Sequence, residues 1–89
     1  MRITRENDSI EVTFDSESPL FIPGEQPWDS SVHPKVLEWV DDHARSFAIM
    51  GGRKHITMVM EFAPEQMDAA CNYFTLVRVA GLQAIETYA

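Results

Sequence analysis

Apolar and polar residues alternate strictly over residues 10–15, Ile-Glu-Val-Thr-Phe-Asp, which is the period of a strand with one buried face. Residues 2–5 precede this segment, and the Asn7-Asp8 pair between them tolerates the positive φ angles of a tight turn. We therefore predict a hairpin. Residues 16–28 are rich in proline, which predicts an ordered loop held to the core by four apolar side chains: Leu20, Phe21, Ile22 and Trp28.

The next segment has the period of an amphipathic helix. At 100° per residue, one half of the wheel carries Val36, Leu37, Trp39, Val40, His43, Ala44, Phe47 and Ala48, and the other carries Glu38, Asp41, Asp42, Arg45 and Ser46. Ser30 or Ser31 is expected to cap the helix, Pro34 suits its first turn, and Gly51-Gly52 is expected to stop it. Asp41 and Arg45 have the i, i+4 spacing of an ion pair.

Strict alternation returns over residues 55–62 and predicts a third strand, which Pro64 follows at the position of a first helical turn. From there one apolar stripe predicts a second helix towards the C-terminus, with a bend near Gly81; its members are Met67, Ala70, Cys71, Phe74, Val77, Ile85 and Tyr88. Leu76 and Val79 project away from this stripe, and Arg78 projects into it. Either the hairpin loop or helix end covers the second patch, or a partner does.

These elements predict a single α+β domain over residues 1–89. We expect a two-layer sandwich in the order ββαβα, with two helices on one face of a small, mainly antiparallel sheet. Connection rules favour pairing of the third strand beside the first.

Composition narrows the classes of partner. Seven Lys and Arg residues against fourteen Asp and Glu residues give a net charge of −7, which disfavours direct binding to nucleic acid or to anionic membranes. A protein with a basic surface is the expected partner.

Cys71 is the only cysteine, so no intrachain disulfide forms. The N-terminal residues lack the apolar core of a signal peptide, and no run reaches membrane-spanning length, so we expect a cytoplasmic protein.

The spacing of the candidate ligand and nucleophile residues does not match that of known metal, catalytic or phosphate-binding sites. The histidines and Cys71 lack the spacing of metal ligands, and Cys71 lies within an apolar stripe, so we expect no metal, no cofactor and no enzyme activity. His43 is interpreted as a hydrogen-bonded core or edge histidine. Gly51-Gly52-Arg53-Lys54 follows a helix instead of opening one, so it differs from a phosphate-binding loop. The acids Glu38, Asp41 and Asp42 look solvated, either as a plain charged face or as a functional stripe.

Residues 38–46, Glu-Trp-Val-Asp-Asp-His-Ala-Arg-Ser, resemble a helical segment of the small acidic anti-CRISPR proteins of the type I-F inhibitor class. The shared features are the tryptophan, the two consecutive acids and the Ala-Arg-Ser end. This resemblance implies a phage protein whose acidic surface occupies a basic nucleic-acid groove on a CRISPR surveillance complex.

The order of elements also resembles that of anti-sigma-antagonist-like regulators. Those proteins carry a phosphorylatable Ser or Thr at the start of the helix after a strand, whereas this chain has Phe62-Ala63-Pro64 there.

The sequence therefore favours a small, acidic, non-enzymatic inhibitor or regulator. We expect Glu38, Asp41 and Asp42 to steer it to a basic protein surface and Trp39 to act as an aromatic anchor. The alternative is a structural or accessory subunit that assembles, as a homodimer or with another protein, through Leu76 and Val79.

Overall fold

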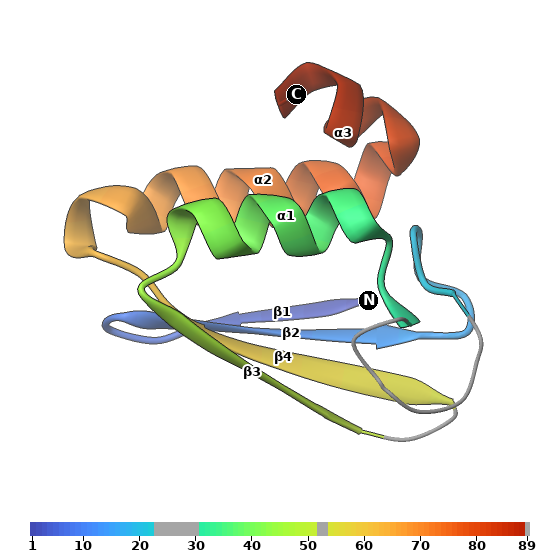
Figure 1. Cartoon of the computed structure of the whole chain (residues 1–89), viewed down its shortest axis with the longest axis horizontal. Helices are drawn as coiled ribbons and strands as arrows, with labels where there is room; N and C mark the ends of the chain where they lie inside the picture. The colour runs from blue at the N-terminus through green and yellow to red at the C-terminus, as the bar shows by residue number, and fades with distance from the viewer. Residues whose placement is uncertain (23–30, 52–53, 89) are drawn as a thin grey trace.

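A computed structural model describes residues 1–22, 31–51 and 54–88 of the chain. Four strands and three helices follow one another in the order ββαββαα (Figure 1). Their bounds are β1 (Arg2–Arg5), β2 (Ser9–Asp15), α1 (Pro34–His43), β3 (Ser46–Gly51), β4 (His55–Glu61), α2 (Met67–Ala80) and α3 (Leu82–Tyr88).

The strands form one antiparallel sheet in the order β1-β2-β4-β3. The predicted hairpin of β1 and β2 is confirmed, with Arg2 opposite Thr13 and Arg5 opposite Ile10. The expectation that the strand at residues 55–61 lies beside the first strand is wrong. That strand, β4, pairs with β2 on one side and with β3 on the other, because the large apolar side chains of β2 and β4 face the same core.

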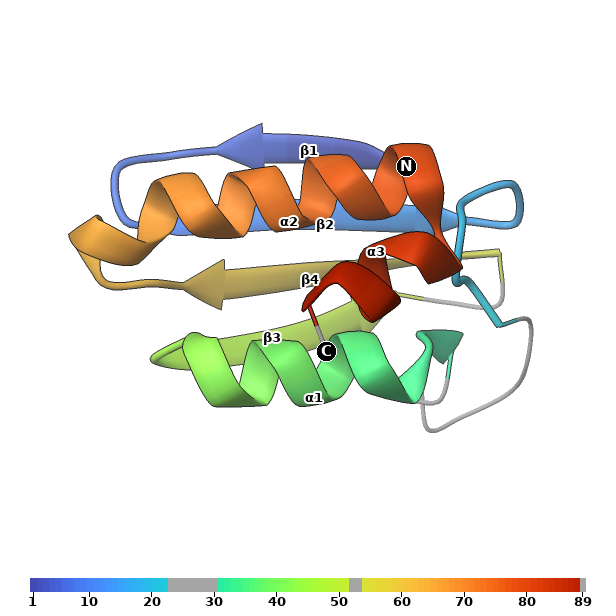
Figure 2. The same ribbon diagram turned by 90° about the horizontal axis from the view of Figure 1, so that it is seen from above.

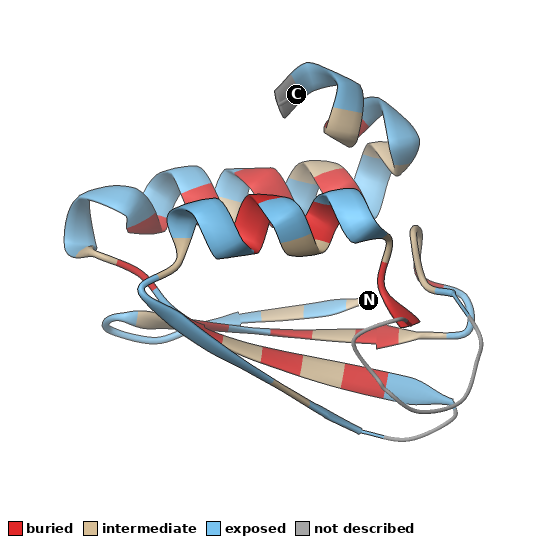
Figure 3. Ribbon diagram, in the orientation of Figure 1, coloured by how far each residue is buried: buried red, intermediate tan, exposed pale blue. Residues whose placement is uncertain are grey.

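All three helices lie over one face of the sheet, so the predicted two-layer α+β architecture is confirmed (Figure 1). The alternating apolar positions of the two central strands form the floor of the core, and they are completely buried: Ile10, Val12, Phe14, Ile56, Met58 and Met60. Figure 3 shows this alternation as buried and less buried bands along β2 and β4. Regular alternation was therefore enough to locate both strands.

The first helix is shorter than its period predicts. It ends at His43, and residues 46–51 form strand β3 instead of a further helical turn. In β3 the alternate residues Phe47 and Ile49 lie opposite Met60 and Met58 of β4. Gly51-Gly52 is therefore not a helix stop; Gly51 ends β3 with a φ of 148°. A fourth strand satisfies the open edge of β4, and this tertiary pairing outweighs the local helical period.

The start of α1 is capped by a residue that the capping rules did not suggest. The Nδ1 atom of His33 accepts a hydrogen bond from the backbone N–H of Lys35 at 3.1 Å, and Pro34 occupies the first helical position as predicted. Ser31 is buried and does not cap the helix, whereas Ser30 lies outside the described residues.

The second predicted helix is divided at Gly81. A short 3-10 turn at Pro64–Gln66 leads into α2, and α3 begins after Gly81, whose backbone has a φ of 55°. The predicted bend is thus a change of direction between two helices. Arg78 is exposed and does not enter the apolar stripe, whereas Tyr73 and Phe74 of the same helix are buried in the core.

The loop after β2 packs only partly as predicted. Leu20 and Phe21 contact the core, and Phe21 forms an isolated bridge with Val32, whereas Ile22 is 40% exposed. Trp28 lies outside the described residues. None of the helices in the described part of the chain is both long and apolar enough to cross a membrane.

Candidate functional site: an acidic helix face beside an aromatic hollow

The three carboxylates that the sequence singled out all lie on the solvent side of α1. Glu38, Asp41 and Asp42 are exposed. Glu38 has a neighbouring cation, since Lys35 Nζ lies 3.4 Å from its Oε2 atom and both side chains are more than half exposed. Among the described residues, no ion pair includes Asp41 or Asp42. The helix therefore presents two negative charges that form no ion pair with the described part of the chain.

Arg45 does not pair with Asp41, as its spacing had predicted. Because α1 ends at His43, Arg45 lies in the connection to β3, where its Nη2 atom is 3.3 Å from Oε1 of Glu61. Ser46 Oγ also donates to the carboxylate of Glu61 at 3.4 Å. The early end of the helix thus leaves Asp41 without its expected partner.

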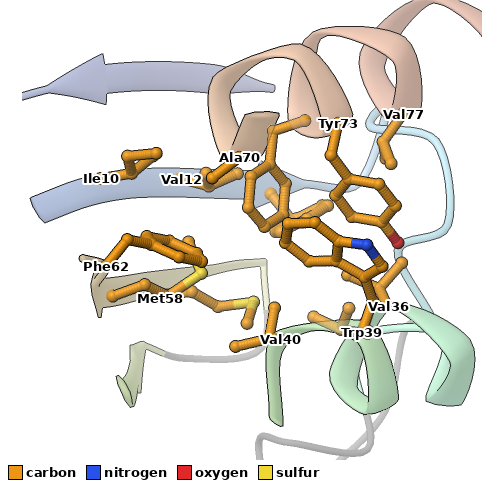
Figure 4. Close-up of a cluster of buried hydrophobic side chains, with 14 of the residues drawn as sticks. Ile10, Val12, Val36, Trp39, Val40, Met58, Phe62, Ala70, Tyr73 and Val77 are labelled. Carbon is orange, nitrogen blue, oxygen red and sulfur yellow. The ribbon is translucent and has the colours of Figure 1, made fainter. Parts of the chain in front are cut away.

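Trp39, which the sequence predicts as an aromatic anchor at the edge of the apolar arc, is buried. Its side chain is 9% exposed and stacks on Tyr73 of α2, with ring centroids 3.9 Å apart and an angle of 5° between the ring planes (Figure 4). Phe74 meets the same ring edge-on at 5.9 Å. Trp39 therefore joins α1 to α2 within the core.

His43 covers the other side of Trp39. Their ring centroids lie 4.3 Å apart, and Nδ1 of His43 donates a hydrogen bond to the backbone oxygen of Trp39 at 2.7 Å. His43 is exposed, which agrees with its interpretation as a hydrogen-bonded edge histidine. It lies in the last turn of α1.

A small hollow of about 210 Å³ lies beside this stack. Its lining residues come from α1, α2 and α3. Figure 2 shows that α3 turns back from α2 towards α1. Carboxylates, a lysine and aromatic rings share its lining: Lys35, Glu38, Trp39, Asp42, His43, Tyr73 and Ile85. The carboxylates beside aromatic rings suit a lysine or arginine side chain, because its N–H groups bind carboxylates and its aliphatic stem packs against rings.

The structure brings only some of the predicted site residues together. Glu38, Trp39 and Asp42 line the hollow, whereas Asp41 is exposed on α1 but does not line it. Leu76 is partly buried against the core, and Val79 is 77% exposed on α2. Sequence reasoning missed Tyr73, although its position three residues after Ala70 and four before Val77 placed it beside the predicted stripe.

A second, wider hollow lies at the end of the sheet where β1 and β4 begin and β2 ends. It has a volume of about 710 Å³ and a lining of mixed charge: Met1, Arg2, Thr13, Asp15, Ser16, Glu17, Lys54 and His55. The backbone N–H of Glu17 and the hydroxyl of Ser18 donate to Asp15 and hold the pKa of its carboxyl below the usual value. These hydrogen bonds stabilise the turn after β2 and leave Asp15 with a structural role.

Other chemically capable residues are dispersed. Over residues 1–22, 31–51 and 54–88, no three His, Cys, Asp or Glu side chains gather closely enough to hold a metal ion. Cys71 is half-buried on α2. Arg5 Nη1 donates to Asp68 of α2 at 2.7 Å, and this hydrogen bond raises the pKa of Arg5.

Comparisons with protein families, with curated proteins and with solved structures found no match to this chain. Of residues 38–46, only those up to His43 are helical.

Proposed function

We propose that this chain is a non-enzymatic inhibitor or regulator that binds a basic surface of a partner protein through the acidic face of α1. The observation that carries this proposal is the exposure of Glu38, Asp41 and Asp42 on one short helix, two of them without an ion pair to any described residue. Unpaired surface charges attract an oppositely charged protein at long range and accelerate association.

The hollow beside α1 gives this face a defined contact point. A lysine or arginine of the partner fits next to Asp42, with its stem against the edges of the Trp39 and Tyr73 rings. The role of Trp39 in this proposal is to shape the wall of the hollow, since its ring faces are covered by His43 and Tyr73.

A basic surface that suits this face is one that normally binds nucleic acid. An anti-CRISPR inhibitor of the kind that residues 38–46 resemble would act in this way, by occupying the groove of a surveillance complex. The proposal predicts that nucleic acid and this chain compete for the same partner.

The test is capture of host proteins on the immobilised chain, with two charge-reversed variants side by side. One variant carries Glu38→Lys, Asp41→Lys and Asp42→Lys. The control carries the same changes at three exposed acids elsewhere: Glu6, Glu17 and Glu86. Because each substitution adds two positive units, both variants change from −7 to −1 in net charge.

We expect the wild type and the control to retain the same partner and the α1 variant to lose it. Retention should fall between about 50 mM and about 500 mM salt, because exposed charges are screened. Added single-stranded or duplex DNA should release the partner. Equal loss in both variants would show that overall charge, and not the α1 face, determines binding.

A second function is favoured by the apolar residues at the end of α2. Val79 is 77% exposed and Leu82 is 60% exposed, on either side of Gly81. An accessory subunit, or a regulator of the anti-sigma-antagonist type, would assemble through this patch. Val79→Asp tests this without disturbing the core, whereas Leu76→Asp would also cost packing energy. Loss of assembly in Val79→Asp, with the α1 variant unaffected, would favour this function over the first.

A further inference from the structure

Strand β3 is an edge strand that lacks the usual protection against pairing with another chain. The sheet order places β1 and β3 at its two edges. Within the described part of the chain, residues 46–51 make no backbone hydrogen bond outside the ladder with β4. An edge strand of this kind has a row of N–H and C=O groups that only water or another strand can satisfy.

The two edges of the sheet differ in charge. β1 carries Arg2 and Arg5, and Arg5 reaches over the sheet to Asp68 of α2 at 2.7 Å. Charged side chains on an edge strand oppose pairing with a further strand. β3, with the sequence Ser-Phe-Ala-Ile-Met-Gly, has no charged residue and no proline.

The apolar side chains of β3 are also accessible. Met50 is 53% exposed, Phe47 is 39% exposed, and Figure 3 shows most of the strand as exposed. Viewed from above, α1 lies along the β3 side of the helical layer (Figure 2). α1 therefore covers one face of β3, and the open face and the outer edge of the strand border solvent.

We infer that β3 pairs antiparallel with β3 of a second copy of this chain, which joins two four-stranded sheets into one of eight strands. The two-fold axis passes through Ile49. Residues on β3 alternate between the helix-covered face, which includes Phe47, Ile49 and Gly51, and the open face, which includes Ala48 and Met50.

On either side of the axis, this register places large side chains opposite small ones: Phe47 of one copy lies opposite Gly51 of the second copy, and Ala48 lies opposite Met50. On the axis, Ile49 lies opposite Ile49 of the second copy and forms a pair of β-branched side chains on the helix-covered face. The strand is thus self-complementary, which is the requirement for a two-fold symmetric interface.

The strand itself adds no charge to an interface between two acidic copies. Two chains of net charge −7 repel each other; β3 contains no acid, whereas the acids of α1 lie on the helix over this strand and add to the repulsion. Salt screens the remaining repulsion between the two copies. The dimer should therefore strengthen as salt rises, whereas binding to a basic partner through α1 should weaken.

The interface is short, because each copy contributes one strand of six residues. Specific, stable complexes bury a total of about 1,200 Å² or more, and we expect a single short strand from each copy to bury less. We therefore expect a weak dimer. The measurement must therefore extend to high protein concentration.

The test compares two double variants by sedimentation equilibrium from about 10 µM to about 1 mM protein. Ala48→Lys with Met50→Lys places like charges opposite each other twice across the two-fold axis. Ala48→Glu with Met50→Lys places opposite charges at the same two positions. Both pairs of substitutions lie on the exposed open face, so folding is preserved in both, which circular dichroism checks.

We expect the wild type to dimerise, and we expect a dissociation constant about tenfold higher for the Lys-Lys variant than for the Glu-Lys variant. Thr4→Lys on the β1 edge is the control and should leave the constant unchanged. A wild type that stays monomeric at about 1 mM and high salt would overturn the inference and leave the β3 edge to a strand of another protein. Equal constants for the two double variants would overturn the register.

Discussion

At the scale of single residues, the stack of His43, Trp39 and Tyr73 joins the two main helices. The ring centroids of Trp39 lie 4.3 Å from those of His43 and 3.9 Å from those of Tyr73. Offset aromatic pairs contribute free energy beyond the area that they bury. The tryptophan that a helical wheel places at the edge of α1 is therefore part of the core, and the acids beside it carry the proposed contact with a partner.

Replacement of Trp39 by alanine should lower the free energy of unfolding by about 3–5 kcal/mol, because truncation of a buried aromatic side chain leaves a cavity. Urea denaturation followed by circular dichroism measures this loss. Trp39→Phe, which keeps a ring in the stack, should lose less. If Trp39 instead acted as an exposed anchor, Trp39→Ala would weaken partner binding at unchanged stability.

At the scale of elements, the boundary between α1 and β3 determines the surface of the protein. Continuation of the helix beyond His43 would have placed Arg45 next to Asp41. The change to a strand moves Arg45 to Glu61 and creates the uncharged sheet edge. Gly51 permits the end of that strand, because its φ of 148° is a conformation that side chains oppose.

Gly51→Ala should destabilise the fold by more than about 1 kcal/mol, since the backbone conformation at this position is one that a side chain opposes. A Cβ atom at this position would lie 2.5 Å from the backbone oxygen of His55 and 2.7 Å from Cα of Ile56. Thermal or urea unfolding measures the effect, and Ala48→Ser on the same exposed strand serves as a control with little change. A fully stable Gly51→Ala protein would contradict the described geometry of the β3 end.

At the scale of the whole molecule, the excess of acids acts on stability as well as on binding. Fourteen acidic residues face seven basic ones, and the ion pairs of the described residues are largely exposed. Exposed pairs contribute little, so self-repulsion within the folded chain remains. The same charge that favours a basic partner therefore costs the domain some stability.

Stability should rise with salt by an amount on the order of 1 kcal/mol between low and physiological ionic strength, because salt screens this repulsion. Urea denaturation at a series of sodium chloride concentrations measures it. The variant with Glu38, Asp41 and Asp42 changed to lysine has a net charge of −1 and should show a weaker dependence. A fall in stability with salt would mean that the ion pairs outweigh the repulsion.

The sequence by itself determined the elements whose hydrophobic pattern fits only one type of secondary structure. Strict alternation over residues 10–15 and 55–61 predicted two central strands. Both strands bury every second side chain completely, which is the cause of this pattern. Pro34 and Pro64 marked the first turns of helical segments, since proline lacks the N–H that has no partner there. The exposure of Glu38, Asp41 and Asp42 also followed from the helical wheel alone.

Only the tertiary structure decided the secondary structure of residues 46–51. Their apolar positions fit both a helical stripe and a strand, and pairing with β4 selected the strand. Strand order, the stacking of Trp39 on Tyr73 and the hollow beside Asp42 depend on contacts between residues far apart in the chain. Local periodicity contains no information about such partners, which is why these features appear only when the layers are packed together.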